Sequence, residues 1–166
     1  MPTTENLKEA FAGESQANRK YLAFAKKAEA DGFPQVARLF RAAAEAETLH
    51  AHAHLRVLGG VNSTAENVAA AVEGEGYEYQ QMYPKFLAEA QAEGNRAAAQ
   101  SFRFALDAEK VHHDLYVQAY AAVKSGRDLE KAVIYLCPVC GNLEVGTAPE
   151  QCPICKAPKA RFVEVA

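Results

Sequence analysis

The chain has 166 residues, enough for one ordinary domain or for a domain with a small attached module. A formal net charge of −3 and an isoelectric point near 6.0 exclude the strongly basic surface that nucleic acids and anionic membranes select. The first residues lack the basic start and apolar core of a signal peptide, and no apolar run approaches the roughly 18 residues of a membrane span. We therefore expect a cytoplasmic protein that binds neither nucleic acid nor membrane.

Good helix formers dominate residues 3–123, and we expect four long helices in this region. Their expected ranges are 4–30, 34–58, 63–94 and 95–124. Thr4 is the candidate N-cap of the first helix, and Pro34 suits the first turn of the second. Ser63 and Glu66 have the spacing of a capping box at the start of the third. The pattern predicts a mainly α fold.

The composition changes after the fourth predicted helix, where Pro, Gly and short strand-like pieces replace the helix formers. We expect a helical domain over residues 1–125 and a small β/loop module over residues 136–166. Residues 126–135 would form the linker and lead into the first strand of the module.

Acidic residues lie near the middle of the apolar stripe of each predicted helix. The stripes contain Glu14, Glu47, Glu75, Glu78 and Glu109. Burying one ionised carboxylate without a partner is strongly unfavourable, so either these stripes face water or cations neutralise them. The recurrence of the charge halfway along four helices, beside aromatic residues, favours cations.

The most specific part of this pattern is Glu-x-x-His, which occurs twice, as Glu47–His50 and Glu109–His112. A spacing of three places a carboxylate and an imidazole on one helix face, one turn apart, where both can reach the same metal pair. A single such motif is a weak signal. Two of them, with inward glutamates on the other helices, are typical of dinuclear carboxylate four-helix bundles. This donor set suits iron or manganese better than copper.

All the cysteines lie near the C-terminus, in two C-x-x-C pairs separated by eleven residues. They are Cys137, Cys140, Cys152 and Cys155. In a reducing compartment this spacing indicates a metal site rather than disulfides. Four thiolates on two tight turns suit zinc or a single iron, and the metal would supply folding energy to a module with little core. The cysteines alone leave structural zinc and redox iron both open.

The segments FAGESQANRKY, EAETLH, EGEGYEYQQMYPKF and AEKVHHDLY resemble the four helices of a rubrerythrin. The cysteine module resembles the rubredoxin-like tail of the same family. This resemblance covers essentially the whole chain, and it implies a ferritin-like four-helix bundle followed by a rubredoxin-like module. It also implies a diiron centre whose ligands are Glu14, Glu47, His50, Glu75, Glu78, Glu109 and His112.

The resemblance further implies roles for individual residues. Glu47 and Glu109 would bridge the two irons, while Glu78 and His50 would alternate on one iron as its oxidation state changes. An oxidised iron favours the anionic carboxylate over the neutral imidazole. Two tyrosines match family residues expected to hydrogen-bond to ligand carboxylates, namely Tyr21 and Tyr83. The four cysteines would hold a mononuclear iron, with zinc as the alternative.

The implied function is that of a non-haem diiron peroxidase, which reduces hydrogen peroxide to water in oxidative-stress defence. Electrons would pass through the four-cysteine iron from a separate reductase or rubredoxin, because the chain has no glycine-rich dinucleotide motif. Two alternatives are a ferroxidase or iron-handling protein, and an electron-transfer protein with a structural zinc tail.

Four nearby residues are expected to have no ligand role. Helical geometry turns Glu73 away from Glu75 by about 200° and His52 away from His50 by the same angle, so both should face solvent. His113 should lie on the surface, and His54 is expected at a core or surface position rather than at the metal site.

The link between the second and third helices limits how a bundle of this type can close. The second helix continues about 12 Å beyond His50, and Glu75 lies about 18 Å beyond the start of the third at Ser63. Residues 59–62 reach only about 14 Å, so they cannot return the chain by roughly 30 Å unless the third helix unwinds. We therefore expect a homodimer, or a higher oligomer, in which chains exchange helix pairs. The resemblance leaves this open, because family members differ in this respect.

Overall fold

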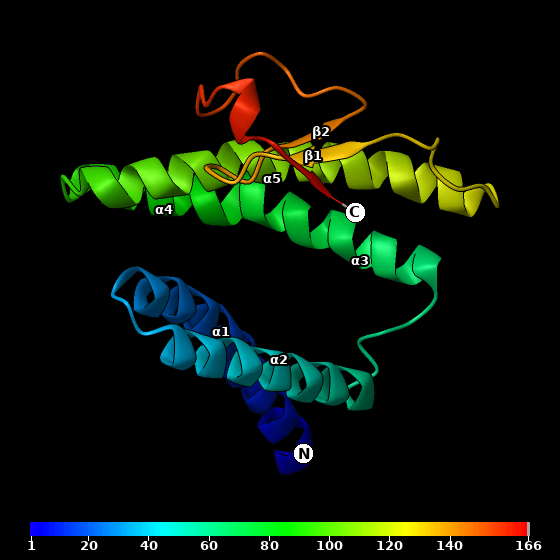
Figure 1. Ribbon diagram of the computed structural model, residues 1–166. Helices are drawn as coiled ribbons and strands as arrows, with labels where there is room; N and C mark the ends of the chain where they lie inside the picture. The colour runs from blue at the N-terminus through cyan, green and yellow to red at the C-terminus, as the bar shows by residue number, and fades with distance from the viewer. Residues whose placement is uncertain (166) are drawn as a thin grey trace. The chain divides into compact units, whose positions relative to one another are not determined.

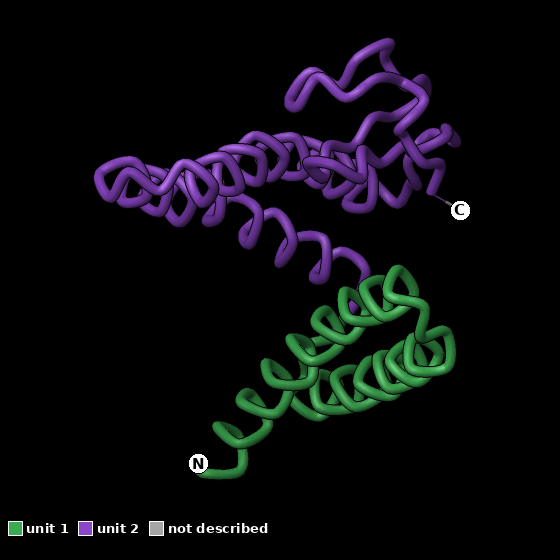
Figure 2. The backbone as a smooth tube through the Cα atoms, turned by 60° about the vertical axis from the view of Figure 1, so that its left-hand side comes forward, with its two compact units in different colours: residues 1–62 green, residues 63–166 purple. Residues whose placement is uncertain are grey.

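The computed structural model describes residues 1–165, in two compact units that divide between Asn62 and Ser63 (Figure 2). In the first unit, α1 (Pro2–Ala30) and α2 (Pro34–Val57) lie side by side as a helical hairpin (Figure 1). The first helix begins two residues before its predicted start, with Met1 rather than Thr4 at the N-cap. Pro2 fits the first turn because it has no N–H to leave unsatisfied there.

Small side chains allow α1 and α2 to approach closely. The fully buried apolar residues of the hairpin are alanines: Ala25, Ala28, Ala37, Ala44 and Ala51. Aromatic contacts add to this packing, with ring centroids 5.6 Å apart for Phe24 and Phe40 and 6.0 Å apart for Tyr21 and Phe40.

Asn18 is a buried polar residue between these helices, with 9% of its surface exposed. Its side-chain nitrogen donates to the carbonyl of Ala44 at 2.7 Å and to the hydroxyl of Thr48 at 2.8 Å. Each such bond contributes about 1 kcal/mol net, and losing it leaves a buried polar group unsatisfied. Asn18 lies one turn after Glu14, and Thr48 follows Glu47, so these bonds fix the two helices beside the predicted ligands.

The second unit begins with a continuous helical arm of three segments: α3 (Thr64–Tyr77), the π-helical η1 (Glu78–Met82) and α4 (Tyr83–Ala92). This arm lies along α5 (Arg96–Lys124) (Figure 1). The predicted capping box is confirmed: the Ser63 hydroxyl accepts from the N–H of Glu66 and the Glu66 carboxylate accepts from the N–H of Ser63.

The π-helical turn was not predicted, since the sequence pattern indicated an uninterrupted helix over this region. Within the turn, the N–H of Tyr83 donates to the carbonyl of Glu78, five residues earlier. Its physical cause is Pro84, which offers no N–H to the carbonyl of Gln80 and would clash with that carbonyl in a regular α-helix. The wider turn carries the helix past the proline, and Glu78 becomes its first residue.

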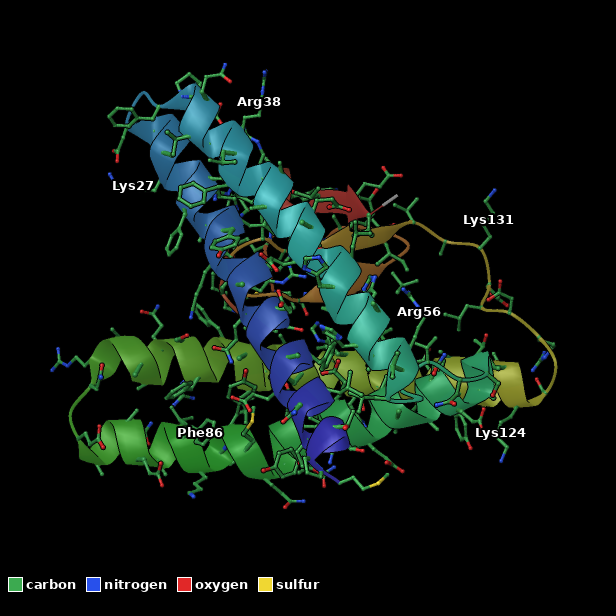
Figure 3. All side chains as sticks on the ribbon, turned by 90° about the horizontal axis from the view of Figure 1, so that it is seen from below. Lys27, Arg38, Arg56, Phe86, Lys124 and Lys131 are labelled. Atoms are coloured by element: carbon green, nitrogen blue, oxygen red, sulfur yellow. The ribbon has the colours of Figure 1, made fainter. Side chains whose placement is uncertain are left out.

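Aromatic side chains hold α4 against α5. Figure 3 shows Phe86 between these helices, where its ring centroid lies 5.6 Å from that of Phe102. The ring of Tyr83 lies 6.3 Å from the same phenylalanine. This cluster fixes the segment that follows the π turn.

The C-terminal module contains a small antiparallel sheet of strand order β2-β1-β3. Its strands are β1 (Ile134–Leu136), β2 (Leu143–Val145) and β3 (Val163–Val165), with the short 3₁₀ helix η2 (Lys159–Arg161) before the last. Three cysteines form its buried centre: Cys137, Cys140 and Cys152.

The predicted class, mainly α with a small β/loop module, is confirmed. The predicted domain boundaries at residues 125 and 136 stay a prediction. Among the described residues, no helix is both long and apolar enough to cross a bilayer.

Candidate metal centres

The N-terminal ligand group consists of Glu14 from α1 together with Glu47 and His50 from α2. Their ligand atoms all lie within 4.8 Å of one another. The Nδ1 atom of His50 is 3.5 Å from a carboxylate oxygen of Glu47 and 3.9 Å from one of Glu14. The Glu-x-x-His spacing therefore brings its two side chains to one point on the hairpin.

The two carboxyl groups of the N-terminal ligand group are close enough to share a proton. A hydrogen bond with Glu47 is the main reason that the pKa of Glu14 is raised. The charges of His50 and His54 act in the opposite direction, so His54 also lies near this carboxyl, whereas His52 is exposed as expected. Carboxyl groups that must share a proton beside an imidazole are suited to a divalent cation, which would replace the proton.

The C-terminal ligand group has the same composition and consists of Glu75 from α3 together with Glu109 and His112 from α5. Its ligand atoms also lie within 4.8 Å of one another. The Nδ1 atom of His112 is 2.7 Å from a Glu109 oxygen and 3.7 Å from a Glu75 oxygen. Burial, followed by the hydrogen bond with Glu109, raises the pKa of Glu75 to about 7. Here too, one of two neighbouring carboxyl groups favours its protonated form.

The second nitrogen of His112 fixes its ring. Nε2 lies 2.8 Å from the carbonyl oxygen of Gly141, and a carbonyl can only accept, so Nε2 carries the hydrogen and donates it. Nδ1 then faces the carboxylates, and the hydrogen bond to Glu109 raises the pKa of His112 to about 8. A metal at Nδ1 would replace the proton there while the bond to Gly141 persisted, as is common for metal-bound imidazoles.

Glu78 stands beside the C-terminal ligand group without joining its close cluster. Burial is the main reason that the pKa of Glu78 is raised, and the charge of Glu109 adds to it. Tyr83 is in the same neighbourhood: burial raises its pKa, and so do the charges of Glu78, Glu109 and Glu75. Of the two tyrosines singled out in the sequence, Tyr83 therefore lies near the carboxylates, while Tyr21 contacts the rings of Phe24 and Phe40.

The four-cysteine site has the dimensions of a metal site rather than of disulfides. The sulfur atoms of Cys137 and Cys155 are 3.6 Å apart, and those of Cys140 and Cys152 are 3.5 Å apart. A tetrahedron with metal–sulfur bonds of about 2.3 Å has edges of about 3.8 Å, whereas a disulfide is about 2.05 Å long. Burial raises the pKa of Cys140 and of Cys155, so a cation is needed to hold these sulfurs as thiolates.

Two equivalent backbone turns present these sulfurs. In the first turn, the N–H of Gly141 donates to the carbonyl of Cys137, and in the second, the N–H of Lys156 donates to that of Cys152. Both residues that donate have positive φ, 85° for Gly141 and 63° for Lys156. This left-handed region favours glycine, so a side chain at position 141 would strain the backbone, as the lysine of the second turn does at its smaller φ.

The first cysteine turn lies directly against α5. A Cβ atom on Gly141 would be 3.8 Å from the Cβ of Ala108, and Phe104 packs against the buried cysteines. Together with the hydrogen bond from His112 to Gly141, these contacts join the four-cysteine site to the C-terminal ligand group within one chain. A cavity of about 250 Å³ between α5 and this turn is lined by Glu109, His112 and Cys140 among others.

Comparison with known proteins is consistent with both metal sites. A model of the family described as rubrerythrin matches residues 5–120, and one described as the rubrerythrin rubredoxin-like domain matches residues 135–163. The chain belongs to the rubrerythrin family. Rubrerythrin-2 of Clostridium acetobutylicum is 35% identical over 96% of this chain and 95% of its own length. Nigerythrin of Nitratidesulfovibrio vulgaris is 39% identical over 96% of this chain and 85% of its own length.

Solved structures of nigerythrin are also similar to this rubrerythrin family member. Those of its partially reduced state and of its fully reduced, all-ferrous state each cover 98% of this chain and 86% of theirs. The sequence identity is 38% and the TM-score 0.59 in both cases. The chain thus has a Glu/His ligand set of the diiron type and a rubredoxin-like four-cysteine site.

The structure brings six of the seven predicted diiron ligands into two groups and leaves Glu78 outside both. Glu73 is exposed, as expected. Sequence reasoning missed Gly141, which contacts a ligand histidine through its main chain. The only available signal was its place directly after Cys140, which says nothing about a partner 29 residues away.

The affinity of this rubrerythrin family member for divalent metal is expected to rise with pH. Glu75 with a pKa of about 7 and His112 with a pKa of about 8 must both lose protons to bind metal. Between pH 6 and pH 8 the affinity for Mn²⁺ should increase by roughly two to three orders of magnitude, about 10-fold from Glu75 and about 50-fold from His112. Titration of the metal-free protein with Mn²⁺ at several pH values, with detection of released protons, measures this.

The free energy of unfolding of the metal-free protein should fall as the pH rises, in contrast to the metal affinity. Folding raises the pKa of both groups, so their contribution to the free energy of unfolding is complete at low pH and is lost as the pH rises. For Glu75 the loss falls between its unfolded-state pKa of 4.5 and its folded-state pKa of about 7. For His112 it falls between 6.5 and about 8. Denaturant unfolding at pH 5 and pH 8.5 tests the sign. Equal Mn²⁺ affinity at pH 6 and pH 8 would contradict the assignment of these protons.

Proposed function

We propose that this protein is a diiron peroxidase of the rubrerythrin type. It reduces hydrogen peroxide with two electrons and two protons, breaking the O–O bond and forming two molecules of water. The observation that carries the proposal is the hydrogen bond from His112 to Gly141, because it connects a carboxylate-rich metal site to a thiolate site suited to one-electron transfer.

The ligand groups would hold two irons, with Glu47 and Glu109 as bridges and Glu14, His50, Glu75 and His112 as terminal ligands. The irons would supply Lewis acidity and the two electrons. The chain itself supplies the carboxylates of the two ligand groups, the imidazole of His112 held by Gly141, and the carboxyl group of Glu78 outside the close cluster. Each ligand group offers only three protein ligands, so a dinuclear site requires both.

Glu78 is the residue proposed to exchange with His50 and to move a proton. Its raised pKa favours the protonated carboxyl, which can donate a proton to an oxygen leaving the cleaved peroxide. Its position on the π turn, outside the close cluster, leaves it free to approach or leave a metal. Tyr83 lies beside this carboxyl and keeps its phenolic proton, because its pKa is raised.

Electrons would reach the carboxylate site through the first cysteine turn. Cys140 directly precedes Gly141, so the carbonyl that accepts the hydrogen bond of His112 belongs to the residue next to a sulfur ligand. A one-electron centre at the cysteines would be filled by an external reductase or rubredoxin. The physiological donor would therefore dock at the C-terminal module.

The proposed assembly is a homodimer in which chains exchange helix pairs. The link between α2, which ends at Val57, and α3, which begins at Thr64, is as short as the sequence indicated. The intact capping box at Ser63 means that the start of α3 does not unwind to lengthen it. The N-terminal ligand group of one chain would then complete the site with the C-terminal ligand group of the partner.

Anaerobic turnover tests the proposed function. We expect the reduced protein to consume hydrogen peroxide much faster than oxygen, without accumulating a mineral. Two irons in the carboxylate site and one in the cysteine site give about three irons per chain. Faster reaction with oxygen together with mineral loading would instead identify a ferroxidase, and two irons with one zinc would rule out the relay.

A further inference from the structure

Gly76 lies in α3 directly after the ligand Glu75, at a point where the side chain of His113 on α5 leaves little room. A Cβ atom added there would be 3.3 Å from Cδ2 and 3.6 Å from Nε2 of His113. The neighbouring Gly74 differs, since a Cβ there meets nothing within 4 Å among the described residues. Of these two helical glycines, Gly76 is therefore the one in contact with α5.

His113 was expected on the surface, but its side chain is only 19% exposed. Its ring lies against α3 at Gly76 and against the ring of Tyr79 one turn later, with ring centroids 5.1 Å apart. Its Nδ1 is 3.4 Å from the carboxylate of Asp114, the next residue of the same helix. Contacts with Gly76 and with the ring of Tyr79 thus limit how far the His113 ring can shift before α5 must move with it.

We infer that Gly76 and His113 form a spacer that sets the distance between α3 and α5 at the C-terminal ligand group. Each spacer residue directly follows a ligand in the sequence: Gly76 follows Glu75, and His113 follows His112. The ligand atoms of Glu75 and His112 are 3.7 Å apart. A larger residue at position 76 would push the ring and α5 outward and separate these atoms. Gly76 and His113 are thus positioning residues.

The test is a double-mutant cycle on the full-length protein, read by Mn²⁺ binding rather than by turnover. Gly76→Ala and Gly76→Leu introduce good helix formers, so their helices should not be weakened. We expect Mn²⁺ affinity to fall by roughly 10- to 100-fold in Gly76→Leu and by less in Gly76→Ala, the range typical for losing support of a metal ligand. The exchange-coupled signal of the Mn²⁺ pair should weaken in parallel.

Shortening the opposing ring supplies the matched control. The double variant Gly76→Leu with His113→Ala should recover most of the lost affinity, because the added side chain then has room. Helix content and the iron absorption of the four-cysteine site should stay unchanged in every variant. Normal Mn²⁺ binding by Gly76→Leu, or purely additive effects of the two substitutions, would overturn the spacer.

The inference rests on the ligand set of the proposed function, but its failure can be told apart from failure of that function. A protein that binds Mn²⁺ normally and shows the coupling between Gly76 and His113, yet does not reduce peroxide, would refute the peroxidase and leave the spacer intact. A protein that reduces peroxide but shows no coupling between Gly76 and His113 would refute the spacer and leave the peroxidase proposal intact.

Discussion

Replacing Cys152 by serine should abolish peroxide reduction driven by an external donor. Cys152 is fully buried at the four-cysteine site, and a serine hydroxyl cannot replace the thiolate that completes it. Loss of a residue that only hydrogen-bonds to a metal ligand typically lowers activity by roughly 10- to 100-fold. Cys152 is a ligand itself, so donor-dependent turnover should fall by more than this. Steady-state consumption of peroxide with a reductase measures it, and a single turnover after chemical reduction should persist.

Zinc substitution provides a control that keeps the module folded. Zinc has the same tetrahedral preference for four thiolates but no redox chemistry, so protein with zinc at the cysteines and iron at the carboxylates should lose donor-driven turnover equally. This separates electron transfer from a loss of structure in the Cys152→Ser variant. Full donor-driven activity of the zinc form would show that electrons take another route.

Mixing two inactive variants should restore activity if the chains exchange helix pairs. Glu47→Gln damages the N-terminal ligand group, and Glu109→Gln damages the C-terminal one. In a swapped heterodimer, one of the two bundles receives only intact groups, so activity should return to about half of that of the unmodified dimer. Co-expression with two affinity tags isolates the heterodimer for measurement of peroxide turnover and iron content.

An unswapped dimer gives a different result, because each bundle would then contain the defect of its own chain. Such a heterodimer would be as inactive as either parent. A heterodimer of two differently tagged Glu47→Gln chains serves as the control and should remain inactive under both arrangements. Recovery in the mixed sample alone therefore identifies exchange of helix pairs.

Local patterns were enough to predict most of the helices and the candidate ligands. The capping box at Ser63 and Glu66 was predictable because its two residues interact with each other and with their own backbone. The Glu-x-x-His pairs were predictable because helical periodicity fixes which side chains share a face. Both signals act within a few residues of sequence.

Features that depend on contact between elements were not predictable in this way. Pro84 is visible in the sequence, but whether a proline kinks a helix or is absorbed by a π turn depends on the packing of the segment that follows, here Phe86 on Phe102. His113 was expected on the surface because periodicity gives an angle around α5 but not the neighbour that covers it. The contact between His112 and Gly141 joins residues 29 positions apart.

The contact between His112 and Gly141 also determines which changes of sequence the protein can tolerate. The acceptor is a main-chain oxygen, which every amino acid possesses, so no point substitution at position 141 removes the atom itself. What must be preserved is the position of the turn on α5, through residues such as Ala108 and Phe104. Insertions or deletions in residues 125–133, which connect α5 to β1, threaten this contact more than substitutions in the turn do. The bridge between the metal sites is thus encoded by chain length and packing rather than by the identity of the bridging residue.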